Sequence, residues 1–258
     1  MKVWHLARRE WSVAFRSPLG YILLAVYALL SGAVFLFFLE RFRQASLRVA
    51  QSPYLVDDLV VPLTPDTWLV QPYVTNLAQI LVFFIPFLTM GSIAGERRSG
   101  SLEILLSYPL STGQIVAGKF LGAFLIYASL VAVNFIHVLL LAFVQPAGPG
   151  MVLTSLLGLL LMGASAIALG IVVSSFSQGP LEAAILTLGL LAGLALAGGS
   201  ESGEGWRAAT RFLSPLGHLE DLGRGILSPS AVLAYGAGTL ASLAMAIRGV
   251  DWLRWRGA

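Results

Sequence analysis

The stretch LGYILLAVYALLSGAVFLFFL, from Leu19 to Leu39, contains no charged residue and is long enough to cross a bilayer as a single helix. Such a crossing needs about 20 predominantly apolar residues, because each residue advances a helix by about 1.5 Å through a hydrocarbon core about 30 Å thick. Comparable apolar runs recur along the chain, so the sequence predicts six membrane-spanning helices. The predicted spans are residues 19–39, 73–94, 119–144, 151–176, 181–199 and 230–247.

The composition agrees with this reading of the apolar runs. Of 258 residues, 57% are hydrophobic and 11% are charged, which excludes a soluble domain with a wet surface. We therefore expect an all-α polytopic membrane protein with one transmembrane domain over residues 1–258. The net charge of +3 fits contact with a lipid bilayer, and we expect no nucleic-acid partner. The chain has no cysteine and three scattered histidines, so we expect no metal site, no cofactor and no catalytic residue.

The segment before the first span is amphipathic. Within residues 1–18, Trp4, Ala7 and Trp11 recur at three- and four-residue spacing, with basic residues between them. This pattern is typical of a helix that lies in the membrane interface. Pro18 marks the predicted bend into the first span, because proline interrupts a continuous helix.

Lys and Arg residues are unevenly divided between the two sides of the predicted membrane domain. Basic residues accumulate on the cytoplasmic side, because their translocation is disfavoured. Six spans place both termini on one side, and most Lys and Arg residues fall on that side. The sequence therefore predicts a multi-pass protein of the cell inner membrane with both termini in the cytoplasm.

The predicted cytoplasmic connection between the second and third spans, residues 95–118, is the most informative loop. It begins GERRSGSLEILLSYPLS, from Gly95 to Ser111, so that charged residues come before a short amphipathic stretch. Leu102, Leu105 and Leu106 fall on one face of a helix at this spacing. The pattern predicts a short helix with one apolar face.

Local signals set the expected ends of this short helix. Ser99 or Ser101 can cap its start, and Tyr108 before Pro109 is a stop signal. A helix of about two turns is not stable alone in water, so it must pack against something. Two partners remain open at this point: the membrane side of its own chain, or a groove in a soluble motor domain.

A stretch that resembles a phosphate-binding loop follows. The residues GQIVAGK, from Gly113 to Lys119, have the glycine and lysine spacing of such a loop, but Phe120 stands where a magnesium-binding Ser or Thr is required. Ser111 and Gln114 form a capping box at the start of a helix instead. We therefore expect no nucleotide site here, and Lys119 is predicted to be an interfacial lysine whose stem lies along the third span.

Strongly ionisable residues are nearly absent from the predicted spans, which disfavours an ion-driven carrier. His137 is the exception, and Asn134 precedes it by three residues on the same helix face. A polar pair of this kind favours a hydrogen bond to a neighbouring helix over proton transfer. Small residues in the later spans allow close packing, within the chain or across a dimer. They include Gly158, Gly163, Gly170, Gly189 and Gly193.

Several stretches together resemble a known family. The segment from Phe84 to Leu110, with Ile115–Phe120, Leu6–Glu10 and Leu213–Ile226, resembles the permease subunits of type-2 ABC exporters. The likeness is strongest to the branch of gliding-motility and nitrous-oxide-reductase maturation permeases. Because these stretches are spread from one end to the other, the resemblance covers the whole chain.

The resemblance implies roles for two groups of residues. The residues implied to contact the ATPase are Glu96, Arg97, Gly100, Glu103 and Leu106. Those implied to form part of an external gate are His218, Glu220 and Arg224. The family often has two acids before the arginines, whereas here Gly95 occupies the first acidic position, so the role of Glu96 follows less directly from the resemblance than that of the whole segment.

The resemblance also implies partners. It indicates a permease that binds a separate cytoplasmic ABC ATPase subunit and pairs with a second copy of itself or with a sister permease. ATP hydrolysis is then expected on the partner chain. Two other functions remain open: a non-transporting membrane scaffold that anchors a partner complex, and an ion-driven secondary carrier.

Overall fold

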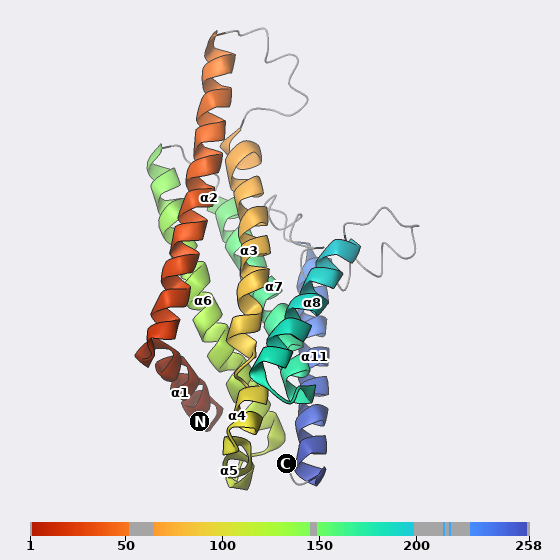
Figure 1. Ribbon diagram of the computed structural model, residues 1–258. Helices are drawn as coiled ribbons and strands as arrows, with labels where there is room; N and C mark the ends of the chain where they lie inside the picture. The colour runs from red at the N-terminus through yellow and green to blue at the C-terminus, as the bar shows by residue number, and fades with distance from the viewer. Residues whose placement is uncertain are drawn as a thin grey trace.

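The computed structural model describes residues 2–51, 64–144, 149–198, 214, 217 and 228–256, and every regular element within them is helical. Six helices in this part of the chain are long and apolar enough to span a membrane, which confirms the predicted all-α polytopic fold. They lie side by side as a bundle (Figure 1). Their bounds are α2 Pro18–Gln51, α3 Gln71–Thr89, α6 Thr112–Val144, α7 Pro149–Phe176, α8 Pro180–Gly198 and α11 Pro229–Arg256.

Helices α2, α6 and α11 extend well past the predicted spans, and α6 does so at its start, Thr112. Helix α2 continues beyond residue 39 to Gln51, and a short π-helical turn, η2 (Asp66–Val70), leads into α3. Glu40 accepts hydrogen bonds from Arg43 and Gln44, one turn further along the same helix, at 2.7–2.9 Å. Side-chain pairs at this spacing stabilise an exposed helix. They therefore support α2 where it continues beyond its apolar run. Helix α11 likewise continues from residue 247 to Arg256.

Helix α3 ends at Thr89, before the predicted span boundary at residue 94. A turn follows, and α4 (Ala94–Arg98) begins after it. The hydroxyl oxygen of Ser174, on α7, accepts hydrogen bonds from the backbone N–H groups of Ile93 and Ala94, at 3.2 and 3.0 Å. This side chain from another helix satisfies the free donors at the start of α4 and so stabilises the break.

The N-terminal amphipathic stretch is helix α1 (Lys2–Arg16), and Pro18 begins α2 as predicted. Two glycines of α6 lie directly beneath α1. A Cβ atom on Gly118 would lie 2.5 Å from Leu6 Cδ2, and one on Gly122 would lie 2.5 Å from Glu10 Cβ. The absence of side chains at these two positions lets the backbones of α1 and α6 approach closely. Helix α1 is therefore part of the bundle; its place in the membrane interface stays a prediction.

The small residues of the later spans fall into two classes. A Cβ on Gly163 would overlap the ring of Tyr127, and one on Gly170 would lie 2.5 Å from Thr89 Oγ1, so both glycines of α7 serve packing within the chain. Gly189 and Gly193, on α8, have nothing within 4 Å of the corresponding position. The α8 pair is thus open to contacts from outside the described chain.

The polar residues inside the bundle join neighbouring helices. The Tyr73 hydroxyl of α3 lies 2.9 Å from Nδ1 of His137 on α6, and the ring of Phe35 on α2 stacks on that histidine. The amide of Asn134 donates a hydrogen bond of 2.7 Å to the Tyr27 hydroxyl on α2. These contacts confirm the predicted interhelical bonding of His137 and Asn134.

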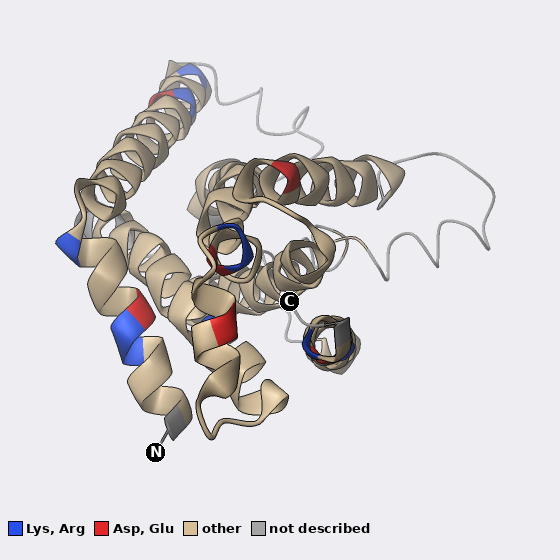
Figure 2. Cartoon of the chain, turned by 60° about the horizontal axis from the view of Figure 1, so that its bottom comes forward, with Lys and Arg blue, Asp and Glu red and all other residues tan. Residues whose placement is uncertain are grey.

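The N-terminal and C-terminal ends of the described chain lie at the same end of the bundle, together with α1, α4 and α5 (Ser101–Ser107) (Figure 1). Figure 2 brings this end forward and shows acidic and basic residues on α1 and on the short helices beside it. We call it the terminal end. The predicted gate residues His218, Glu220 and Arg224 lie outside the described residues.

Candidate coupling site at the terminal end

The link between α4 and α5 is made by Gly100. Its φ of 71° is in the left-handed region, which a residue with a side chain adopts only at a cost. Gly100 is also the N-cap of α5, and no side chain caps that helix. The predicted caps Ser99 and Ser101 are therefore wrong. Instead, the hydroxyls of Ser99 and Ser101 donate to the carbonyl oxygen of Glu96, at 3.1 and 3.4 Å. The two hydroxyl oxygens lie 2.8 Å apart, because the turn at Gly100 brings the two side chains together.

The amphipathic character of α5 is as predicted. Leu102 and Leu105 are buried, and Leu106 is partly buried against the same core. The helix ends at Ser107, and Tyr108 has an extended backbone before Pro109, which confirms the predicted stop. The apolar face of α5 is therefore already packed on its own chain.

The opposite face of α5 is open. Ile104 is 64% exposed and Tyr108 is 59% exposed, and Glu103 between the buried leucines is exposed too. A large apolar side chain that stands outside the packed face, beside a charged one, is available to a partner. We call Glu103 and Ile104 of α5, together with Tyr108 directly after its end, the outer face of α5. The sequence pattern gave no sign of Ile104 and Tyr108 as contact residues, because hydrophobicity alone does not tell a packed residue from an exposed one.

Lys119 of α6 is the most deeply placed charged residue at this end. The residue is 3% exposed, and its ammonium nitrogen lies 2.8 Å from Glu10 Oε1 of α1 and also pairs with Glu96 Oε1 of α4. Helix α1 docks over Gly118 and Gly122 and covers the Lys119 side chain, so this lysine is buried within the protein. Its position at the membrane interface stays a prediction. One lysine thus joins three helices.

This cluster of three charges, which we call the Lys119 cluster, is held by pairing. Moving a charge out of water costs several kcal/mol, and only close opposite charges and hydrogen bonds offset that cost. Two carboxylates face one ammonium group, and Glu96 Oε2 is buried without a hydrogen-bond partner among the described residues. Glu96 is therefore directed into the chain, where Lys119 holds it in place.

The basic residues of α4 contact the turn between α7 and α8. Arg97 donates a hydrogen bond of 3.5 Å to the carbonyl oxygen of Ser177, and a Cβ on Gly179 would lie 3.8 Å from Arg98. Of the five predicted ATPase contacts, Gly100 and Glu103 are exposed, whereas Glu96, Arg97 and Leu106 are partly buried. The structure thus divides this group into an outer part and an anchoring part.

Comparisons with known proteins agree with this architecture. Residues 4–246 match the family model described as "ABC-2 family transporter protein". The chain is 30% identical over 138 residues to the "Probable ABC transporter permease protein NosY" of Stutzerimonas stutzeri, a match that covers 52% of this chain and 43% of that protein. The protein of the same name from Pseudomonas aeruginosa PAO1 is 30% identical over 137 residues, or 52% of this chain and 42% of that protein. The matches thus span less than half the length of these relatives. With six helices in the described residues that are long and apolar enough to span a membrane, and a family match over nearly its whole length, the chain belongs to the ABC-2 transporter family.

Proposed function

We propose that this chain is the permease subunit of an ABC exporter in the cell inner membrane, that the terminal end faces the cytoplasm, and that a separate ATPase subunit docks on the outer face of α5. The observation that carries this proposal is a short helix that is packed on one side and exposes Glu103, Ile104 and Tyr108 on the other. The excess of Lys and Arg at the terminal end supports its cytoplasmic orientation.

The contacts of α4 suggest how movement of the ATPase reaches the spans. The Lys119 cluster ties α4 to α1 and α6, and Ser174 ties the start of α4 to α7. Gly100 is the single left-handed residue among the described positions and joins α5 to this anchored unit. A displacement of α5 is therefore passed to several spans together, as alternating access requires. The assignment of His218, Glu220 and Arg224 to an external gate rests on the family resemblance.

Substitution of the outer face of α5 should abolish ATPase binding without unfolding the permease. In the variant Glu103→Lys with Ile104→Asp, we expect co-purification of the ATPase subunit to fall about tenfold or more, because central apolar contacts dominate the affinity of an interface. The unfolding temperature of the permease should stay close to that of the wild type, since both side chains are exposed. Pull-down from membranes and thermal unfolding in detergent measure the two effects.

A matched control is Arg48→Glu, which reverses an exposed charge near the far end of α2 and should leave ATPase binding intact. Leu102→Asp, on the buried face of α5, should lower the unfolding temperature as well as binding. Wild-type levels of ATPase capture by the double variant would show that α5 is not the docking helix.

We further propose that two permeases share one complex, either two copies of this chain or one copy with a sister permease. The open glycines of α8, Gly189 and Gly193, support a close contact with a second membrane protein. Co-expression of the chain with two different affinity tags should give capture of one tagged copy by the other, or capture of a single different permease in equal amount. Native mass spectrometry that finds one permease per complex would contradict this part of the proposal.

A further inference from the structure

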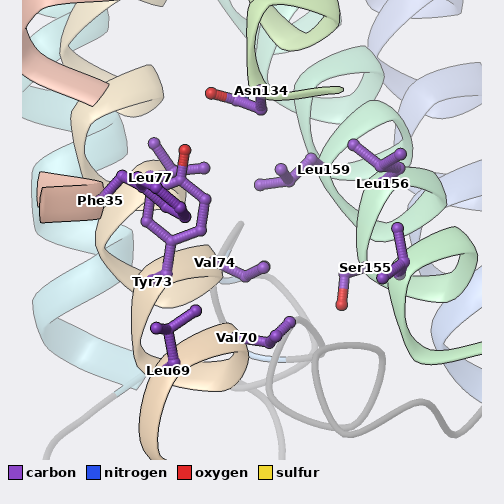
Figure 3. A pocket seen from close by; sticks show the side chains of 11 residues that line it. Phe35, Leu69, Val70, Tyr73, Val74, Leu77, Asn134, Ser155, Leu156 and Leu159 are labelled. Carbon is purple, nitrogen blue, oxygen red and sulfur yellow. The ribbon is translucent and has the colours of Figure 1, made fainter. Parts of the chain in front are cut away.

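The surface of the bundle offers more to a ligand than its interior does. The pocket between α3 and α7 that Figure 3 shows has room for about one water molecule. Its wall is mostly aliphatic and contains no charged side chain. The exposed side of α1, in contrast, combines several charged and aromatic residues.

This side of α1 carries positive charge without a matching negative charge. Arg8, Arg9 and Arg16 are exposed and form no ion pair within the described part of the chain, and Figure 2 shows basic residues along the helix. The single acidic residue of α1 is Glu10, which is directed toward α6 and pairs with Lys119 at 2.8 Å. The surface that α1 turns away from the bundle therefore keeps an excess of basic charge.

Aromatic side chains accompany the three arginines. Trp4 and Trp11 are 56% and 41% exposed, and they share one flank of the helix because they lie about two turns apart. The ring centroids of Trp11 and Phe15 are 5.1 Å apart, and those of Phe15 and Tyr21 are 5.9 Å apart. The aromatic row thus continues from α1 onto the first turn of α2. We call the exposed tryptophans and arginines of α1 its basic-aromatic side.

The elbow between α1 and α2 fixes this surface relative to the first candidate span. A Cβ on Gly20 would lie 2.2 Å from the carbonyl oxygen of Ala14, so glycine is required for so close an approach of the two helices. Directly after the elbow, α2 exposes a run of large apolar side chains. They are Leu19, Tyr21, Ile22, Val26, Leu29 and Leu30. The basic-aromatic side of α1 therefore lies next to the beginning of a surface that suits hydrocarbon.

The combination of residues indicates the partner. Tryptophan favours the level of the lipid headgroups, where one part of its ring is apolar and the N–H remains hydrated. The guanidinium group of arginine matches the geometry of phosphate oxygens. A soluble acidic protein would match the charges of α1, but it would not account for an aromatic row that continues into the apolar surface of α2.

We propose that the basic-aromatic side of α1 binds the headgroups of anionic phospholipids. Arg8, Arg9 and Arg16 contact the phosphates, and Trp4 and Trp11 insert beside the upper acyl chains. A zwitterionic phospholipid binds less well, because its own cation offsets the phosphate charge. This proposal rests on the membrane-spanning fold and not on the docking of an ATPase.

The test measures which lipids gather around α1 in the full chain. The chain has no cysteine, so Ser12→Cys introduces a single position for a fluorophore, and the Ser12 hydroxyl bonds only the Arg9 carbonyl oxygen of its own helix. The labelled chain is placed in phosphatidylcholine nanodiscs with a minor fraction of a nitroxide lipid, which is either phosphatidylglycerol or phosphatidylcholine. We expect quenching that corresponds to about fivefold or greater local enrichment of phosphatidylglycerol, the effect of at least one basic residue near anionic lipid.

Two triple variants separate charge from other effects. With Arg8, Arg9 and Arg16 all changed to Gln, the two nitroxide lipids should quench equally, whereas with all three changed to Lys the enrichment should persist. Both variants should keep the unfolding temperature of the wild type, because the three side chains are exposed. A control label at Leu29→Cys, further along α2 and 74% exposed, should be quenched equally by both lipids.

Three results would overturn the proposal. Equal quenching of the wild-type label by the two lipids would mean that α1 does not select anionic headgroups. Enrichment that persists in the Gln variant would mean that the arginines do not bind them. No quenching by either lipid would mean that this side of α1 faces water or a soluble partner.

Discussion

Replacement of Lys119 by methionine should destabilise the permease by about 3 kcal/mol and uncouple α4 from α1. The side chain keeps its length but loses the charge that neutralises Glu10 and Glu96, so two partly buried carboxylates then repel each other. Glu96 Oε2 already has no hydrogen-bond partner among the described residues, so the loss is not offset nearby. Thermal unfolding in detergent measures the stability, and ATP-driven transport by the reconstituted complex measures the coupling.

The control for this prediction removes all three charges together. In the triple variant Lys119→Met, Glu10→Gln and Glu96→Gln, no unpaired charge remains, and stability should recover most of the lost amount, because replacing a whole buried ion pair is often nearly neutral. Coupling should stay impaired, since the ionic link between α1, α4 and α6 is absent. An unfolding temperature of the single variant equal to that of the wild type would mean that the Lys119 cluster does not stabilise the fold.

Gly163→Ala should destabilise the bundle by about 1 to 3 kcal/mol, the usual range for an overpacked core. The new methyl group would overlap the ring of Tyr127, which is fully buried and donates a hydrogen bond of 2.7 Å to the carbonyl oxygen of Leu159. To make room, α6 and α7 must move apart and strain that bond. The drop in unfolding temperature, together with loss of monodisperse protein on size exclusion, reports this effect.

Gly236→Ala in α11 is the matched control, because nothing lies within 4 Å of its added methyl group. It should be neutral or stabilising by up to about 1 kcal/mol, since alanine favours helix more than glycine does. If both substitutions lower the unfolding temperature equally, the close contact between Gly163 and Tyr127 is not what limits the packing of α7.

The helices themselves were predictable, because the signals that define them are local. The apolar run from Leu19 to Leu39 lies within α2, and the capping box at the start of α6 is present in full. Ser111 N–H donates to Gln114 Oε1 and Gln114 N–H donates to Ser111 Oγ, both at 3.2 Å. The apolar face of α5 and its end before Pro109 were predictable for the same reason, because the residues that determine them are close together in the sequence.

The contacts at the candidate site were not predictable in this way. Lys119 is 109 residues from Glu10 and 23 from Glu96 along the chain, and no periodicity links positions so far apart. The break in the helix after Thr89 was not predictable for the same reason, because it is stabilised by Ser174, which belongs to another helix. Ser99 and Ser101 do not cap α5 as predicted, because the N-cap residue is Gly100, whose backbone is left-handed.

By itself the sequence determined which helices of the described chain are long and apolar enough to cross a membrane, the amphipathic character of α1 and α5, and the family. Each of these depends on residues that are neighbours in the chain or on the apolar length of one segment. Tertiary structure alone decided that Lys119 is buried and that Glu96 faces inward while Ile104 faces outward. It also decided that Tyr127 occupies the space beside Gly163, whereas nothing lies within 4 Å of a Cβ at Gly189. The physical reason is that burial and pairing are properties of which helix faces meet, and that choice is made only when the helices pack.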